Sequence, residues 1–286
     1  MISSDRRYSL NILRLAGVAA CVGFLTVAVS GQTGAGAQQT QQTQKPKPFE
    51  PTVGQAGKDV VWVPTPQVLV NRMLDLAKVT PSDYVMDLGS GDGRTVITAA
   101  KRGATAVGVE FNPDMVELSK RNAADAGVSA KATFIQGDLF KADLSKATVI
   151  TMFLLPSINM QLRPTILDLK PGTRIVTNSF TMEDWEADET SHLTEKDNCT
   201  GSWCTAYFWV VPAKVEGTWK VGSNSLTLTQ KFQMLTGTLG SSSISNGRLR
   251  GAAISFSVGG TKYTGTVDGN TMKGTTSGGQ SWTATK

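Results

Sequence analysis

The sequence has few of the side chains that bind transition metals. Its 286 residues include one histidine, His192, and three cysteines. A structural zinc site takes four cysteine or histidine ligands, commonly supplied as two closely spaced pairs. Only Cys199 and Cys204 form such a pair, and no second pair exists. The sequence therefore argues against the usual zinc sites, and we expect no metal site.

Runs of basic residues are also absent. The chain has 28 basic and 23 acidic residues, and the excess that gives its net charge of +5 is scattered along the sequence. Nucleic-acid-binding domains concentrate lysine and arginine on one face or along one helix. We therefore expect no nucleic-acid partner.

The longest apolar run is short and lies near the N-terminus. Three arginines precede this run, residues 15–29, and the Ala-Gly-Ala of residues 35–37 has the pattern of a cleavage site. A membrane-spanning helix needs about 20 apolar residues. Residues 1–37 are therefore predicted to be a signal peptide that exports the chain to the periplasm or cell envelope, with an uncleaved membrane anchor as the alternative. Residues 38–58, rich in Gln, Thr, Lys and Pro, are predicted to be a disordered linker.

Export bears on the redox state of the cysteines. Cys21 lies inside the apolar run and would leave with a cleaved leader. Cys199 and Cys204, which enclose Thr-Gly-Ser-Trp, would then remain as an even pair in an oxidising compartment. This situation favours a local disulfide.

The most informative stretch is VMDLGSGDGR, residues 85–94. It predicts a strand (Tyr84–Leu88), a glycine turn that lets a ligand approach the backbone, and a helix that begins at Arg94. The spacing departs from the dinucleotide pattern G-x-G-x-x-G, and the Gly-Lys-Ser/Thr of a phosphate loop is missing. Two carboxylates flank the glycines and would repel a pyrophosphate, whereas they would hold the sulfonium and ammonium groups of S-adenosylmethionine. We therefore expect this cofactor to contact Asp87, Gly89, Ser90, Gly91 and Gly93.

Two further strand ends fit the same cofactor. A strand over residues 106–109 ends in Glu110, about twenty residues past the first glycine, where an acidic side chain can bind both ribose hydroxyls. Phe111 follows it and is also expected in the site. A strand over Ala132–Gln136 leads to Asp138, which could accept a hydrogen bond from the adenine amino group while Leu139 packs on the ring.

At these residues the chain resembles the class I S-adenosylmethionine-dependent methyltransferases. The motifs DLGSGDGR, VGVEFNP, QGDLF and PGTRIV occur in the order typical of the family. The resemblance implies an α/β fold with a Rossmann-like sheet over residues 59–212 and S-adenosyl-L-methionine as cofactor. It also implies that the segment before the first helix covers the methionine end of the cofactor, which makes Thr65 an expected contact.

The predicted fourth strand, residues 148–153, ends where class I enzymes place the methyl acceptor. Phe153, Leu154, Leu155 and Pro156 stand at this end. They offer no polar group to orient the amine of a nucleic-acid base and no carboxylate for metal-assisted methylation of a catechol. With VPTP and DLF, this FLLP resembles the small protein-lysine N-methyltransferases related to the mitochondrial enzymes that act on ATP synthase and the nucleotide carrier. The resemblance implies N-methylation of a protein lysine, with a small molecule as the alternative acceptor.

An acidic stretch follows the predicted fifth strand. Residues 183–189 contain five carboxylates around Trp185. They could attract a cationic lysine segment, or they could be a solvated face, and the sequence leaves both interpretations open.

From Ala213 onward, Gly, Ser and Thr dominate and short alternating runs are separated by glycine turns. Residues 213–286 are therefore predicted to be a small all-β domain, a barrel or a sandwich. A domain this small needs its aromatic residues inside, although a partner-binding surface is an alternative. The expected core aromatics are Trp219, Phe232, Tyr263 and Trp282.

A leader conflicts with a cofactor that is made in the cytoplasm, so three hypotheses stay open. The chain could be an active methyltransferase, held at a membrane with its domain facing the cofactor pool. It could be an exported, inactive fold that binds a small ligand, or a scaffold for an envelope-binding β domain. The first is favoured because an inactive site has no physical reason to keep Asp87, Gly89, Gly91, Glu110 and Asp138 together.

Overall fold

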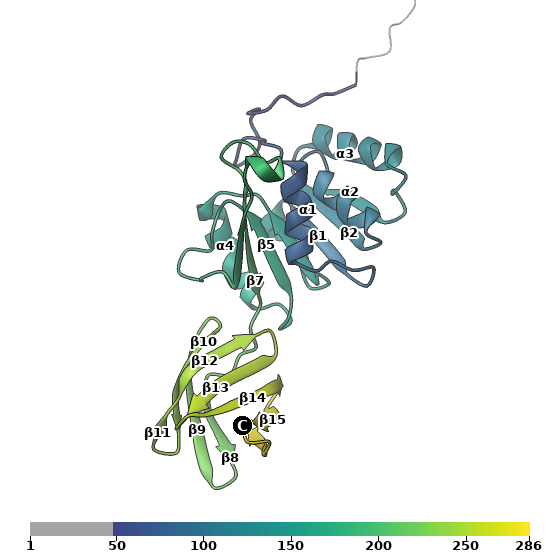
Figure 1. Cartoon of the computed structure of the whole chain (residues 1–286). Helices are drawn as coiled ribbons and strands as arrows, with labels where there is room; N and C mark the ends of the chain where they lie inside the picture. The colour runs from purple at the N-terminus through teal and green to yellow at the C-terminus, as the bar shows by residue number, and fades with distance from the viewer. Residues whose placement is uncertain (1–47) are drawn as a thin grey trace, which may run out of the picture. The chain divides into compact units, whose positions relative to one another are not determined.

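The computed structural model describes residues 48–286 and folds them around two separate sheets (Figure 1). The predicted leader and residues 38–47 of the predicted linker lie outside the described residues. Within residues 48–286, no helix is both long and apolar enough to cross a membrane.

The first sheet has seven strands in the order β3-β2-β1-β4-β5-β7-β6. The first five are parallel to one another, and β7 pairs antiparallel with both β5 and β6. This arrangement confirms the Rossmann-like α/β fold. The strands are β1 (Tyr84–Leu88), β2 (Thr105–Glu110), β3 (Ala132–Gln136), β4 (Val149–Met152), β5 (Arg174–Asn178), β6 (Glu189–His192) and β7 (Thr205–Val210).

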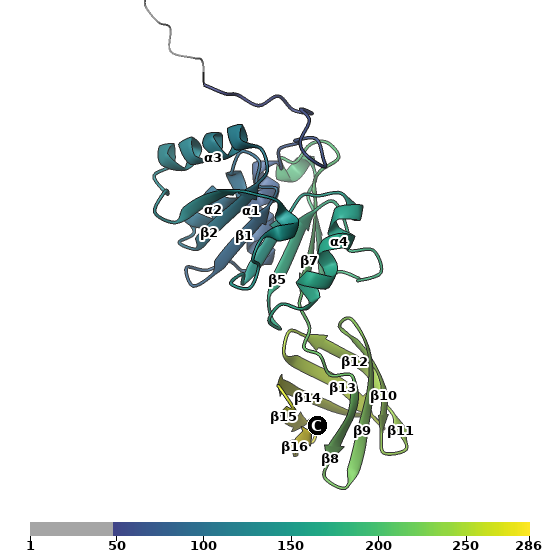
Figure 2. The same ribbon diagram turned by 180° about the vertical axis from the view of Figure 1, so that it is seen from behind.

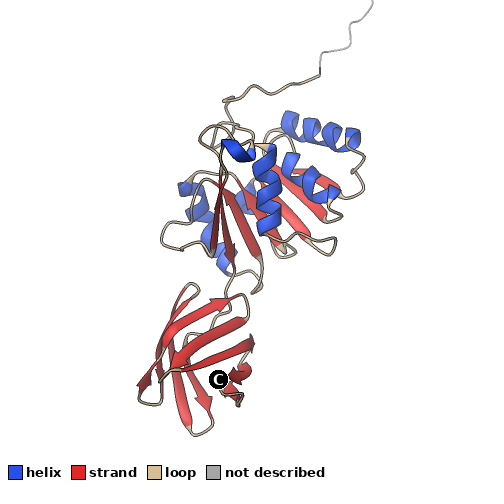
Figure 3. Cartoon of the chain, in the orientation of Figure 1, coloured by secondary structure: helices blue, strands red, loops and turns tan. Residues whose placement is uncertain are grey.

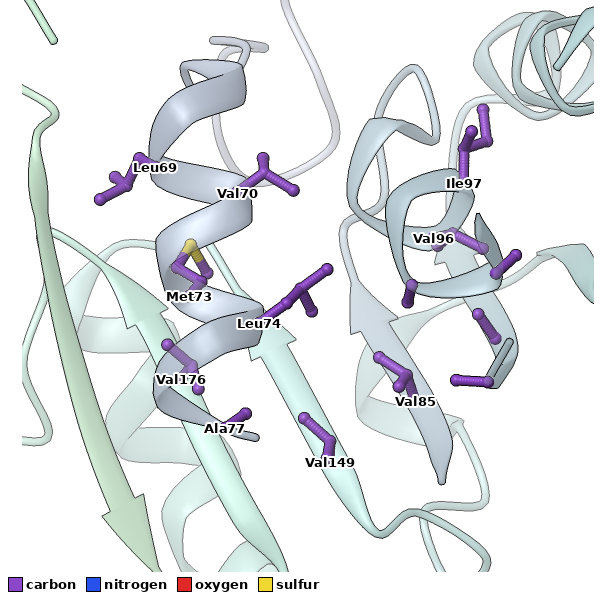
Figure 4. Packing of buried hydrophobic residues seen from close by; sticks show 14 of the residues in the cluster. Leu69, Val70, Met73, Leu74, Ala77, Val85, Val96, Ile97, Val149 and Val176 are labelled. Carbon is purple, nitrogen blue, oxygen red and sulfur yellow. The ribbon is translucent and has the colours of Figure 1, made fainter. Parts of the chain in front are cut away.

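Four helices cover the two faces of this sheet (Figures 1 and 2). They are α1 (Gln67–Leu76), α2 (Arg94–Lys101), α3 (Pro113–Asp125) and α4 (Pro156–Leu167). Because side chains alternate along a strand, neighbouring residues of β1 face opposite ways. Val85 packs with the buried residues of α1, α2 and α3, whereas Met86 packs with those of α4. Figure 4 shows the first cluster, in which Leu69, Met73 and Leu74 of α1 lie near strand residues such as Val149 and Val176.

The second sheet consists only of antiparallel strands (Figure 3). It contains β8 (Gly217–Val221), β9 (Asn224–Lys231), β10 (Met234–Leu239), β11 (Ser242–Ser243), β12 (Ser245–Arg250), β13 (Ala253–Val258), β14 (Thr261–Asp268), β15 (Thr271–Thr276) and β16 (Ser281–Thr285). The sheet closes on itself, because β9 pairs with both β8 and β10 and β16 pairs with β8. Trp219 and Trp282 are buried inside, and Tyr263 packs against them, as predicted. Phe232 differs from the prediction, because its ring stacks on Trp185 of the first domain, with centroids 5.8 Å apart.

The acidic stretch at residues 183–189 is largely a solvated face, because four of its five acidic residues are exposed and only Asp188 is turned inward. Trp185 is fully buried, and the Asp188 side chain is 1% exposed. Arg248 of β12 donates to Asp188 over 2.6 Å, and Arg250 pairs with Glu189 over 2.5 Å. Asp188 and Glu189 thus tie the stretch to the second sheet, and attraction of a lysine segment by the stretch stays a prediction. The sequence pattern could not show these ion pairs, because the paired residues are about sixty positions apart.

Candidate active site

A cavity of about 440 Å³ opens at the carboxyl ends of the parallel strands. Its walls include the residues that directly follow β1, β2, β3 and β4, and Phe180, two residues after β5. In open α/β sheets, ligands bind at this edge because the loops that leave the strands meet there. The volume is that of a site for a small molecule or cofactor.

Most of the residues predicted for the site line this cavity. The lining residues among them are Thr65, Asp87, Gly89, Ser90, Glu110, Phe111, Asp138, Leu139, Phe153, Leu154 and Leu155. Gly91, Gly93 and Pro156 are not among the lining residues, because the first two shape the turn and Pro156 begins α4. That the lining residues bind the cofactor stays a prediction.

The glycine turn has a backbone that requires glycine. Gly91 has φ +55°, and a Cβ there would lie 2.6 Å from the indole nitrogen of Trp62. Gly93 has φ +81° and precedes α2, where a Cβ would lie 2.7 Å from the Phe134 ring. The N–H groups of Gly89 and Ser90 both donate to the carbonyl of Val109 in β2, which fixes the turn over the sheet.

Asp87 forms the buried floor of the cavity. It is 7% exposed, and Thr151, its neighbour across the β1–β4 register, donates a hydrogen bond of 2.6 Å to its carboxylate. Burial raises the pKa of Asp87 to about 7, and the nearby carboxylates of Asp92 and Glu110 contribute in the same direction. Asp92 itself is engaged by Arg94, whose Nε donates over 3.0 Å. No salt bridge to Asp87 is found among the described residues, so its carboxylate is available to a cationic ligand.

Glu110, the last residue of β2, has a fixed orientation. One carboxylate oxygen accepts from the N–H of Gly91 over 3.0 Å, and the other accepts from the N–H of Asn112 over 2.9 Å. A carboxylate has about four acceptor positions, so each oxygen can accept one further hydrogen bond, for example from a hydroxyl group. The arrangement suits a vicinal diol such as a ribose.

Ser90 contributes a buried hydroxyl that has no hydrogen-bond partner among the described residues. A Cβ on Gly108 would lie 2.5 Å from this hydroxyl, so glycine at that position leaves it room. A buried polar group without a partner costs free energy. The hydroxyl lies against Gly108 and is closed off from solvent, so it does not indicate what the cavity holds.

Asp138 has a partner that the sequence did not indicate. Lys58 donates to its carboxylate over 3.0 Å, and the ammonium also lies 5.3 Å from the centroid of the Phe111 ring. The hydrogen bond from Lys58 lowers the pKa of Asp138, which keeps the carboxylate ionised. Gln55 donates to the sulfur of Met115 in the same region. The structure thus corrects the prediction of a disordered linker at its C-terminal end, where these long-range polar contacts hold the segment against the cavity.

The other end of the cavity is apolar. Three aromatic residues contribute to it, and the sequence had indicated only Phe153. The residues that line this end are Met152, Phe153, Leu154, Leu155, Ile158, Phe180 and Trp203. None of them has an ionisable side chain, as expected from the FLLP pattern.

Trp203 was missed as a site residue. It stands next to Cys204 in a loop that the Cys199–Cys204 disulfide closes, with the sulfurs 2.02 Å apart. The bond confirms the predicted pairing. The available signal was a large aromatic residue inside a short disulfide loop, a place where it cannot turn into the core of the sheet.

Known proteins with similar sequences share this part of the chain. The family model described as the ANTKMT methyltransferase domain matches residues 87–189. A protein-lysine N-methyltransferase from Saccharolobus islandicus is 46% identical over 133 residues, which are 46% of this chain and 83% of that protein. The adenine nucleotide translocase lysine N-methyltransferase of Mus musculus is 36% identical over 119 residues, which are 41% of this chain and 52% of that protein.

Solved structures are also similar. The crystal structure of an RNA methyltransferase from Salinibacter ruber in complex with S-adenosyl-L-homocysteine has 47% sequence identity and a TM-score of 0.49. The match covers 54% of this chain and 96% of that chain.

Proposed function

Because this chain belongs to the class I S-adenosylmethionine-dependent methyltransferases, in the family of the ANTKMT methyltransferase domain, we propose that it N-methylates a protein lysine. The observation that carries the proposal is the contrast between the two ends of one cavity. Carboxylates line one end, and the other end has no ionisable side chain. The first end suits the cofactor, and the second suits an uncharged amine.

The residues of the polar end have separate tasks in holding the cofactor. Asp87 offers a carboxylate to the cationic methionine end, Glu110 accepts from the ribose hydroxyls, and Asp138 accepts from the adenine amine. Bound S-adenosyl-L-methionine supplies a methyl group on a sulfonium, which needs no further activation. The protein therefore has to orient the acceptor and exclude water more than it has to act as acid or base.

The apolar end prepares the amine. A lysine must lose its proton to become a nucleophile, and apolar surroundings disfavour the charged form and lower the pKa of an amine. The nitrogen then forms a bond to the methyl carbon as the carbon–sulfur bond breaks and its electrons remain on sulfur. The proton of the product ammonium leaves to solvent, because no residue lining this end is a base.

The location of the protein is part of the proposal. The leader pattern of residues 1–37 and the Cys199–Cys204 disulfide both support an exported or membrane-anchored protein. A membrane anchor would allow association with the membrane and with substrates there. A small-molecule acceptor is the second candidate. It is supported by the apolar end of the cavity, which has no polar side chains that would recognise a particular protein substrate.

The test is transfer of label from radiolabelled S-adenosyl-L-methionine to fractionated cell extract by the full chain. We expect label on protein, recovered as methylated lysine after acid hydrolysis. Extract whose lysine amines have been acetylated is the matched control and should lose the label. Label found only in RNA or in small molecules would overturn the proposed acceptor.

A further inference from the structure

Three aromatic residues meet at the apolar end of the cavity. Phe153 follows β4, Phe180 follows β5 by two residues, and Trp203 precedes β7 by two residues. The strands β4, β5 and β7 are neighbours in the sheet, and β7 runs antiparallel to β5. These positions therefore fall at one edge, although Phe153 and Trp203 are fifty residues apart in sequence.

The three rings pack against one another in one cluster. Their centroids lie 5.9 Å apart for Phe153–Phe180, 5.4 Å for Phe153–Trp203 and 5.5 Å for Phe180–Trp203. The two phenyl rings are inclined by 23°, and the indole is inclined by 61° and 51° to them. The cluster borders the cavity, because all three residues line it.

Packing of the core does not account for Trp203. Trp185, Trp209 and Trp219 are at most 1% exposed, whereas Trp203 is 36% exposed. Both cysteines beside it are buried, and the N–H of Leu193 donates to the carbonyl of Cys204. The disulfide therefore holds, at the edge of the site, an indole that keeps about a third of its surface exposed while it packs on Phe153 and Phe180.

We propose that Phe153, Phe180 and Trp203 bind the cationic amine of the acceptor and its methylated forms, with Trp203 as the specificity-determining residue. The inference rests on the proposed function, because it names how that function recognises its acceptor. Cations are attracted to the faces of aromatic rings, most strongly to tryptophan. No carboxylate lines this end of the cavity, so the rings are the groups available to attract a cation there.

Rings suit this task better than a carboxylate would. An opposite charge within about 4–6 Å favours the charged form of a group, shifting its pKa by about 1–3 units, and would make an ammonium slow to lose its proton. Ring faces attract a cation more weakly. They bind the arriving ammonium without raising its pKa as much as a carboxylate would, so the amine can still lose its proton. They also hold a methylated ammonium, whose carbon-rich surface suits apolar walls, so we expect a partly methylated lysine to stay for further transfer.

The test uses the full chain saturated with S-adenosyl-L-homocysteine and two small probes. One probe is Nα-acetyl-Nε-trimethyllysine amide. The other is its uncharged analogue, with a tert-butyl group in place of the trimethylammonium. Calorimetry should show that the charged probe binds about 5–30-fold more tightly, the range expected for a desolvated cation on aromatic faces.

Variants at Trp203 decide the assignment. Trp203→Ala should abolish most of the preference for charge, and Trp203→Phe should keep part of it, while both bind S-adenosyl-L-homocysteine as the wild type does. Met234→Ala, which removes another exposed apolar side chain, is the matched control. Joint substitution Cys199→Ser and Cys204→Ser should raise KM for the acceptor and leave KM for the cofactor unchanged.

Equal binding of the two probes, or a charge preference that survives Trp203→Ala, would overturn the inference. These outcomes are separate from failure of the proposed function. If lysine is methylated and probe binding ignores Trp203, only the aromatic site is wrong. If the charged probe binds through Trp203 and no lysine is methylated, the site stands as an ammonium-binding site and the proposed acceptor is wrong.

Discussion

The substitution Asp87→Asn should stabilise the protein at alkaline pH and weaken its hold on the cofactor. The pKa of Asp87 is raised from 3.8 to about 7 because the carboxylate is buried. At about 1.4 kcal/mol per pKa unit, ionisation of this buried group costs on the order of 4 kcal/mol of folding free energy. The folded pKa is the higher one, so this stability is fully present below about pH 4, the unfolded pKa, and is lost as pH rises through about 7.

Urea unfolding followed by helical circular dichroism measures this effect. The wild type should become less stable between about pH 4 and 7, and Asp87→Asn should remove most of that dependence. Asparagine can still accept the hydrogen bond from Thr151, so the variant should exceed the wild type by about 2–4 kcal/mol at pH 8 and match it near pH 4. Asp268→Asn, an exposed change of the same kind, is the matched control.

The same residue ties cofactor affinity to pH. A cationic ligand favours the ionised carboxylate, so S-adenosyl-L-methionine should bind more tightly as pH rises through about 7 and release a proton from Asp87 on binding. Calorimetry in buffers of different ionisation enthalpy counts that proton. A variant no more stable than the wild type at alkaline pH, together with wild-type affinity that is flat across neutral pH, would refute this account of Asp87.

Three further changes test other parts of the structure. Glu110→Ala should weaken S-adenosyl-L-methionine binding by about 1–3 kcal/mol in calorimetry, because two oriented acceptors are lost, and unchanged affinity would remove Glu110 from the site. Arg248→Ala should lower stability to thermal unfolding by about 1–3 kcal/mol, because it leaves the buried Asp188 carboxylate without its charged partner, and an unchanged Tm would contradict this. Removal of residues 213–286 should preserve the helical circular dichroism signal and lower the Tm, since Trp185 loses the ring that covers it, whereas loss of the whole signal would show that the β domain is required for folding.

The sequence is sufficient for those parts of the fold that rest on local patterns. β1 and β3 begin and end at the predicted residues. β1 is a buried parallel strand and reads as a continuous apolar run, whereas β3 is an edge strand that alternates more and is bounded by the glycine after it. The polar end of the cavity follows from the same strand ends. β6 was missed because its residues, Glu189–His192, are polar and mostly exposed, so they show no alternation.

The sequence patterns could not predict which residues contact the site from distant positions in the sequence. Lys58 contacts Asp138 across eighty positions, and the composition around Lys58 is that of a linker. Trp203 reaches the cavity only because β7 returns antiparallel beside β5. Local periodicity carries no information on such pairings, so a search of the sequence finds the side chain and misses its neighbours.

The closure of the second sheet sets an order of events during synthesis of the protein. Most of its strands pair with the strand that follows, so those ladders can form as the chain leaves the ribosome. β10 also pairs with β12, past the two-residue β11, but the one pairing that joins the two ends of the domain is that of Thr285 in β16 with Lys220 in β8. Until residue 285 has emerged, the sheet is an open ribbon with two free edges, each of which can pair with another chain. The interval between synthesis of β15 and release of β16 is therefore when this domain is most exposed to aggregation.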